Sequence, residues 1–87
     1  MFSPVKGVPL NSVVKGRRLI ITHVPDGHTK VKLIRFGILG GELIRCLERL
    51  PGGTVVIEKN RQEIAIGAEL ATSIRVSYAG GDEYSNE

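Results

Sequence analysis

Two histidines and an aspartate lie close together in the sequence and carry side chains that bind divalent transition metals. His23 and His28 are five positions apart, and Asp26 lies between them. Imidazole nitrogens and a carboxylate oxygen suit ions such as Zn²⁺ or Ni²⁺. The spacing matches no structural zinc motif, and no pair of cysteines accompanies it. We therefore expect no tightly bound cofactor and at most weak divalent metal binding at His23 and His28, the plainer interpretation being two ordinary surface histidines.

The single cysteine, Cys46, is the strongest candidate for a catalytic nucleophile. It lies between the apolar residues Ile44 and Leu47 in a predicted strand, and free cysteine is among the most often buried residue types. The sequence has no glycine-rich phosphate loop ending in Lys-Ser/Thr and no Gly-x-Ser-x-Gly motif. We therefore expect Cys46 to pack in the core and the protein not to be an enzyme.

Basic residues outnumber acidic ones by twelve to nine, and three of the acids lie in the last six residues. Up to Gly81, twelve bases oppose six acids, so this part of the chain has a charge of +6. A basic surface of this kind suits an acidic protein face, nucleic acid or anionic headgroups. A charged surface that only maintains solubility is an equally good interpretation.

A nucleic-acid interface is the alternative that the basic residues raise. The candidate phosphate-binding residues are Arg17, Arg18, Lys30, Lys32 and Arg35. Proteins that bind single strands combine such charges with aromatic stacking platforms. This chain has no tryptophan, two phenylalanines and two tyrosines. No nucleic-acid partner is therefore expected.

Short elements separated by frequent turns must position these residues. β-branched and alternating segments predict strands over Arg17–Val24, Glu42–Leu50, Thr54–Lys59, Gln62–Ile66 and Ile74–Tyr78. A short helix is predicted over Thr29–Phe36, ended by Gly37 with Ile38 folded back against it. A helical turn over Gly67–Ser73 precedes the last strand. Five short strands within residues 10–78 predict a mostly-β fold, a small barrel that closes its edges.

Eighty-seven residues are enough for one domain. Residues 1–9 and 79–87 show no periodic pattern, so we expect a flexible N-terminal flank and a flexible acidic tail around a folded part, 10–78. No apolar run approaches the roughly 18 residues that a membrane span requires. The absence of a charged-then-apolar leader, together with the lone cysteine, favours a cytoplasmic location.

The predicted core contains twelve side chains drawn from every expected element. They are Leu19, Ile21, Leu33, Phe36, Ile44, Cys46, Val55, Ile57, Ile64, Ile66, Leu70 and Val76. Because burial of one large apolar side chain is worth about 1.5–3 kcal/mol, we expect Leu33→Ala and Phe36→Ala each to destabilise the protein strongly.

The segment Lys30–Gly41 resembles the FeoA-family run basic-x-Arg-Leu-x-Asp-Leu-Gly-Leu-x-Pro-Gly, with Leu33, Phe36, Gly37, Ile38 and Gly41 on the family's apolar and glycine positions. Gly16 matches an early turn, Leu50-Pro51-Gly52-Gly53 a later one, and Glu63–Val76 the family's closing segment. The similarity covers about residues 10–77. Arg35 replaces the usual acid, Gly40 the proline, and Asn60-Arg61 stands where a hairpin glycine is common.

The resemblance implies a cytoplasmic SH3-like barrel that assists a ferrous-iron membrane transporter carrying a GTPase domain. It implies protein–protein docking at the membrane rather than catalysis. On that basis we expect the helix and the turn before it to contact the partner through Asp26, His28, Lys30, Lys32 and Arg35. The alternative is a free-standing SH3-like module that binds a metal or nucleic acid.

Overall fold

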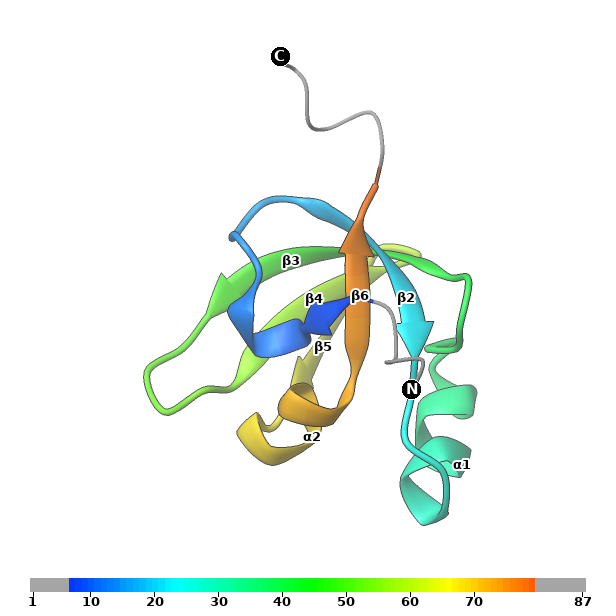
Figure 1. Ribbon diagram of the computed structural model, residues 1–87. Coiled ribbons are helices and arrows are strands. Elements are labelled where there is room, and N and C mark those ends of the chain that lie inside the picture. The colour runs from blue at the N-terminus through cyan, green and yellow to red at the C-terminus, as the bar shows by residue number, and fades with distance from the viewer. Residues whose placement is uncertain (1–6, 80–87) are drawn as a thin grey trace, which may run out of the picture.

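The computed structural model describes residues 7–79, which form a six-stranded antiparallel sheet with two short α-helices (Figure 1). The elements in chain order are β1 (Val8–Pro9), the 3-10 helix η1 (Leu10–Ser12), β2 (Arg18–His23), α1 (His28–Arg35), β3 (Leu43–Arg49), β4 (Val55–Lys59), β5 (Gln62–Ile66), α2 (Ala68–Ser73) and β6 (Arg75–Tyr78). The mostly-β architecture, the helix after the first long strand and the helical turn before the last are as predicted.

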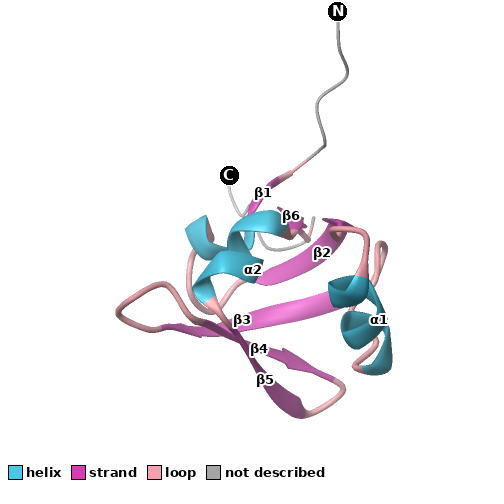
Figure 2. Ribbon diagram, turned by 90° about the horizontal axis from the view of Figure 1, so that it is seen from below, coloured by secondary structure: helices cyan, strands magenta, loops and turns pink. Residues whose placement is uncertain are grey.

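The strands pair in the order β1-β6-β2-β3-β4-β5, so the last strand lies beside the first long one. Figure 2 shows the sheet curling around its core, with α1 and α2 at different sides of it. Helix η1 lies against α2, where the Asn11 side chain donates a hydrogen bond to the Thr72 hydroxyl at 3.0 Å. These two short elements close one end of the curled sheet.

Strand β1 corrects the expected domain boundary. Val8 pairs with Val76, and Pro9 with Arg75, so both residues belong to the sheet rather than to a flank ending at residue 9. Proline is tolerated here because β1 is an edge strand, where one side of the backbone needs no partner. The flanks expected over 1–6 and 80–87 lie outside the described residues.

Fifteen of residues 7–79 form the buried core. They are Leu10, Val13, Leu19, Ile21, Val24, Leu33, Ile38, Ile44, Cys46, Val55, Ile57, Ile66, Ala71, Ile74 and Val76. Nine of the twelve predicted core residues are among them, and Ile64 and Leu70 pack at the margin. Phe36 was wrongly predicted, since 51% of its surface is exposed. It follows the last residue of α1, and its side chain lies outside the core although Leu33 and Ile38 on either side of it in the sequence are buried.

The β4–β5 hairpin turns at Asn60 and Arg61, as predicted. Both residues have positive φ, 53° and 68°, which is the requirement of a type I′ turn. Positive φ is uncommon for an arginine, so this turn holds Arg61 in a conformation that its own preference does not favour. The β4–β5 pairing, from Lys59 with Gln62 to Val55 with Ile66, keeps the turn in place.

Candidate functional site

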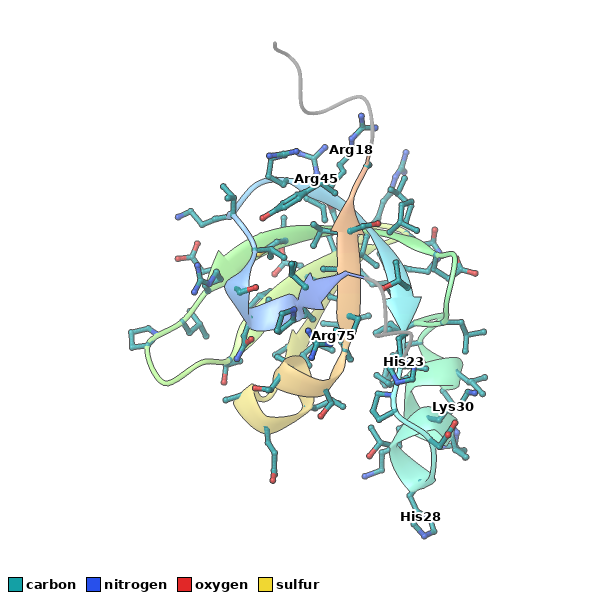
Figure 3. All side chains as sticks on the ribbon, in the orientation of Figure 1. Arg18, His23, His28, Lys30, Arg45 and Arg75 are labelled. Carbon is teal, nitrogen blue, oxygen red and sulfur yellow. The ribbon has the colours of Figure 1, made fainter. Side chains whose placement is uncertain are left out.

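Helix α1 and the turn before it form the candidate site, and the end of β2 positions them. Val24 follows β2 and is buried, which anchors the chain before it leaves the sheet. Pro25, Asp26 and Gly27 make the turn, and Gly27 precedes the helix with φ of 98°. In Figure 3 the helix extends beside the sheet, so most of its surface faces outward.

The far end of α1 is fixed by a Schellman ending, as predicted. The amide of Ile38 donates to the carbonyl of Leu33 at 2.9 Å, and the amide of Gly37 donates to that of Ile34 at 2.9 Å. Gly37 has φ of 74°, which a glycine adopts without strain. Leu33 and Ile38 are both buried, so this ending places the two side chains that attach α1 to the core.

The charged residues predicted to bind a partner all lie on the outer surface. Lys30 forms an ion pair with Asp26 at 3.6 Å, one helical turn apart. Lys32 and Arg35 are exposed, and neither forms an ion pair with any of residues 7–79. Both lie in the last turn of α1, where positive charge favours the helix dipole. His28 is the exposed first residue of the helix.

Apolar side chains accompany these bases, which the sequence reasoning missed. Val31, Ile34 and Phe36 are 57%, 48% and 51% exposed. Val31 and Ile34 are three residues apart and lie on one helix face. The sequence analysis assigned Leu33 and Phe36 to the core, but this two-turn helix packs on the core through Leu33 and leaves Phe36 exposed. The shortness of the helix was the available signal.

The structure does not bring His23 and His28 together. His23 ends β2, whereas His28 points outward at the tip of α1 (Figure 3). His23 is also opposite Arg75 in the β2–β6 pairing, and a neighbouring cation opposes binding of a metal ion. Within residues 7–79, no group of three or more His, Cys, Asp or Glu side chains is arranged to hold a metal.

Cys46 is fully buried, as predicted. Burial raises the pKa of the Cys46 thiol, an effect that the nearby Arg49 guanidinium partly offsets. A thiol with a raised pKa and no access to solvent is a poor nucleophile. Cys46 therefore acts as a packing residue of the core.

The basic residues considered for nucleic-acid binding separate into two groups. Arg17 stacks on the Tyr78 ring, with its guanidinium carbon 4.3 Å from the ring centroid. Arg18 lies at the same end of the sheet, whereas Lys30 lies on α1, away from it (Figure 3). These cations therefore do not form one continuous phosphate-binding surface.

No helix formed by residues 7–79 is long and apolar enough to cross a bilayer. A curled six-stranded antiparallel sheet of this size, with a short helix that carries exposed charged and apolar side chains, is typical of a small SH3-like domain. Comparison with known proteins then identifies which such domain this is.

The family model described as the FeoA domain matches residues 8–78. The chain is 32% identical to an iron uptake regulatory protein (FeoA) of known crystal structure, with a TM-score of 0.74 over 83% of this chain and 97% of that one. It is 26% identical to iron(II) transport protein A from Clostridium thermocellum, with a TM-score of 0.77 over 85% of this chain and 47% of that one. The chain belongs to the FeoA family, and the SH3-like fold class predicted for it is confirmed.

The same fold occurs as part of larger proteins. Crystalline ScaR with bound Zn²⁺ has a TM-score of 0.74 and 24% identity, covering 83% of this chain but 37% of ScaR. At this identity the likeness shows the fold alone. A search of curated proteins found no match to the chain.

Proposed function

We propose that this protein is a non-enzymatic accessory subunit of ferrous-iron uptake, docking on the cytoplasmic part of a membrane transporter that carries a GTPase domain. Membership of the FeoA family supports the role in iron transport, because relatives are described as an iron uptake regulatory protein and an iron(II) transport protein. The burial of Cys46, the strongest candidate nucleophile in the sequence, is consistent with a binding role rather than catalysis through this thiol.

The observation that carries the proposal is the mixed surface of α1. Exposed apolar side chains, here Val31, Ile34 and Phe36, contribute affinity when a partner removes them from water. Lys32 and Arg35 beside them suit an acidic rim on that partner. Protein interfaces commonly combine an apolar centre with a charged periphery. Asp26, His28 and Lys30 extend this docking surface toward the start of the helix.

The test is an NMR titration of the isotope-labelled chain with the soluble GTPase region of the ferrous-iron transporter of the same organism. We expect shifts to cluster on residues 26–37. Ile34→Ser should weaken binding, since it removes apolar contact area without touching the core. Leu50→Ser is the matched control, because Leu50 is also exposed, at 41%, but lies between β3 and β4.

Electrostatics are tested in the same complex. Charges at the edge of an interface mainly set the association rate and its sensitivity to salt, so the affinity should fall as the salt concentration is raised. The fall should be less steep for the double variant Lys32→Gln/Arg35→Gln than for the original chain. Equal effects of Ile34→Ser and Leu50→Ser, or no shifts at high concentrations of both proteins, would reject α1 as the docking surface.

A further inference from the structure

A second surface, distinct from α1, carries a concentration of arginines. A cavity of about 220 Å³ lies over the outer side of β2 and β3 and beside the β4–β5 turn. Arg18, Arg45 and Arg61 line it together with the Asn60 amide. Leu43, Ile44, Glu58 and Lys59 also line it. Figure 3 shows Arg18 and Arg45 at the same end of the sheet, away from His28 at the tip of α1.

Strand register places two of these arginines in direct opposition. Arg18 on β2 is the cross-strand partner of Arg45 on β3. Opposite residues of an antiparallel pair project to the same face, with Cβ atoms about 4.5–5.5 Å apart. Two like charges in this position destabilise a sheet unless something negative lies between them. On the other side of Arg45, the register places Glu58 of β4 opposite it, so the three residues form a row across β2, β3 and β4 with two positive charges and one negative charge.

The third arginine reaches the cavity through an unusual backbone conformation. Arg61 has φ of 68° in the β4–β5 turn, where glycine would be less strained. An arginine at this position places a cation at the mouth of the cavity, beside the Asn60 amide. The β4–β5 turn thus brings Arg61, and the pairing of β2 with β3 brings Arg18 and Arg45, to the same cavity.

Two of the three guanidiniums are available for a ligand. Arg18 already has an interaction partner. Within residues 7–79, neither Arg45 nor Arg61 forms an ion pair, even though Glu58 is the β4 neighbour of Arg45. The ammonium of Lys59 is held by Glu42 at 3.0 Å. Among residues 7–79, Glu58 is the one acidic side chain that lines the cavity, against four basic ones, Arg18, Arg45, Lys59 and Arg61.

We propose that this cavity is a binding site for a phosphate-bearing anion, going beyond the docking function proposed above. Planar guanidinium groups bind phosphate oxygens in pairs through charge-assisted hydrogen bonds. The cavity is smaller than the roughly 300–1,000 Å³ of sites for drug-sized ligands, and so suits one or two phosphate groups. An anion bound by the Arg45 and Arg61 guanidinium groups gains charge-assisted hydrogen bonds from two cations that form no ion pair within residues 7–79.

The experiment titrates inorganic diphosphate into the isotope-labelled full chain in metal-free buffer, with ionic strength held constant by sodium chloride. We expect saturable shifts of the amides of 18, 43–45 and 58–61 and of the Arg45 and Arg61 side-chain Nε–H groups. Arg45→Gln should weaken binding by about tenfold, the usual effect of losing a hydrogen-bonded charge pair. Glu58→Gln should strengthen it, because it removes the one lining carboxylate.

Arg35→Gln is the matched control, since it removes one exposed arginine from α1 and leaves the cavity intact. Its affinity for diphosphate should stay within about twofold of the original chain. An Arg45→Gln chain should unfold at about the same urea concentration as the original chain, because Arg45 is exposed and forms no ion pair within residues 7–79, and this separates lost binding from lost folding. Shifts spread over all basic residues, or equal weakening by Arg35→Gln and Arg45→Gln, would overturn the proposal. Neither outcome depends on whether α1 binds the transporter.

The source of the phosphate is resolved by a second arm. Vesicles of phosphatidic acid in phosphatidylcholine, compared with phosphatidylcholine alone, present phosphate monoesters on a surface. Co-sedimentation that Arg45→Gln abolishes and Arg35→Gln preserves would assign the site to a lipid headgroup. Saturable diphosphate binding without such co-sedimentation would assign it to a soluble phosphate. Failure of both arms would reject the site.

Discussion

At the residue scale, the burial of Cys46 links its chemistry to the stability of the fold. Its pKa is raised in the folded state because burial disfavours the thiolate. The unfolded chain ionises this thiol near its ordinary pKa of about 8.5, whereas the folded chain retains the proton. The stabilising contribution of the thiol is therefore complete below that pH and is lost as the pH rises through the folded-state pKa.

We expect the free energy of unfolding, measured by urea denaturation, to fall as the pH rises above about 8.5, the ordinary pKa of the thiol in the unfolded chain. Cys46→Ala should be less stable at pH 7, because it leaves a cavity, but its stability should fall less steeply over this range. Any other pH dependence of stability is common to both chains and cancels in the comparison. Identical slopes would contradict a raised thiol pKa.

Gly37 is a second residue whose role is local and testable. A Cβ added there would lie 3.2 Å from Cε of Lys59, whose side chain is only 10% exposed, and φ at this position is 74°. Gly37→Ala should therefore cost about 1–2 kcal/mol of unfolding free energy, the penalty for a left-handed non-glycine residue. Gly40→Ala is the control, since no atom lies within 4 Å of its added Cβ. Equal losses at both positions would show that Gly37 has no special requirement.

At the element scale, α1 has residues that pack against the core and residues that are exposed to solvent. Leu33 is 3% exposed and Phe36 is 51% exposed. Leu33→Ala should lower the unfolding free energy by about 2–5 kcal/mol, whereas Phe36→Ala should change it by less than about 1 kcal/mol. This corrects the expectation that both substitutions destabilise strongly. Urea denaturation of the two variants measures the difference.

Phe36→Ala should instead weaken docking on the transporter's GTPase region, because it removes exposed apolar area from the proposed interface. Leu33→Ala is a poor probe of docking, since partial loss of α1 would weaken binding for a different reason. A strongly destabilised Phe36→Ala chain would mean that Phe36 belongs to the core after all.

At the scale of the whole molecule, β1 completes the sheet and extends the folded domain beyond its expected start. A chain beginning at residue 10 loses the pairing of Val8 and Pro9 with β6. We expect its free energy of unfolding to be about 1–2 kcal/mol lower than that of a chain beginning at residue 7, because one or two backbone hydrogen bonds contribute about that much. Equal urea midpoints for the two chains would restore the boundary at residue 10.

The distribution of charge over the molecule separates its two proposed surfaces. Lys32 and Arg35 lie on α1, whereas Arg45 and Arg61 lie at the cavity over β3 and the β4–β5 turn. The sequence alone shows only an excess of bases before residue 82. Folding divides that excess into a face suited to a protein and a cavity suited to a small anion.

Much of the fold was predictable because its signals are local. The Pro25–Gly27 turn, the glycine that ends α1 and the Asn60–Arg61 hairpin each act within a few residues, so sequence identifies them directly. Alternation along β2 and β4 also assigned Leu19, Ile21, Val55 and Ile57 to the core. The FeoA-like order of glycines and apolar residues indicated the family.

What only the tertiary structure decided depends on contacts between distant residues. The position of Phe36 depends on how α1 rests against the sheet, and β1 forms because β6, more than 60 residues later, offers it an edge. The irregular β3–β4 pairing between Cys46 and Glu48 interrupts the alternation from which the faces of β3 were predicted. Arg18 and Arg45 become neighbours only through the pairing of β2 with β3. The sequence does not show which residues of two strands will be paired, because the pairing register depends on the folded sheet.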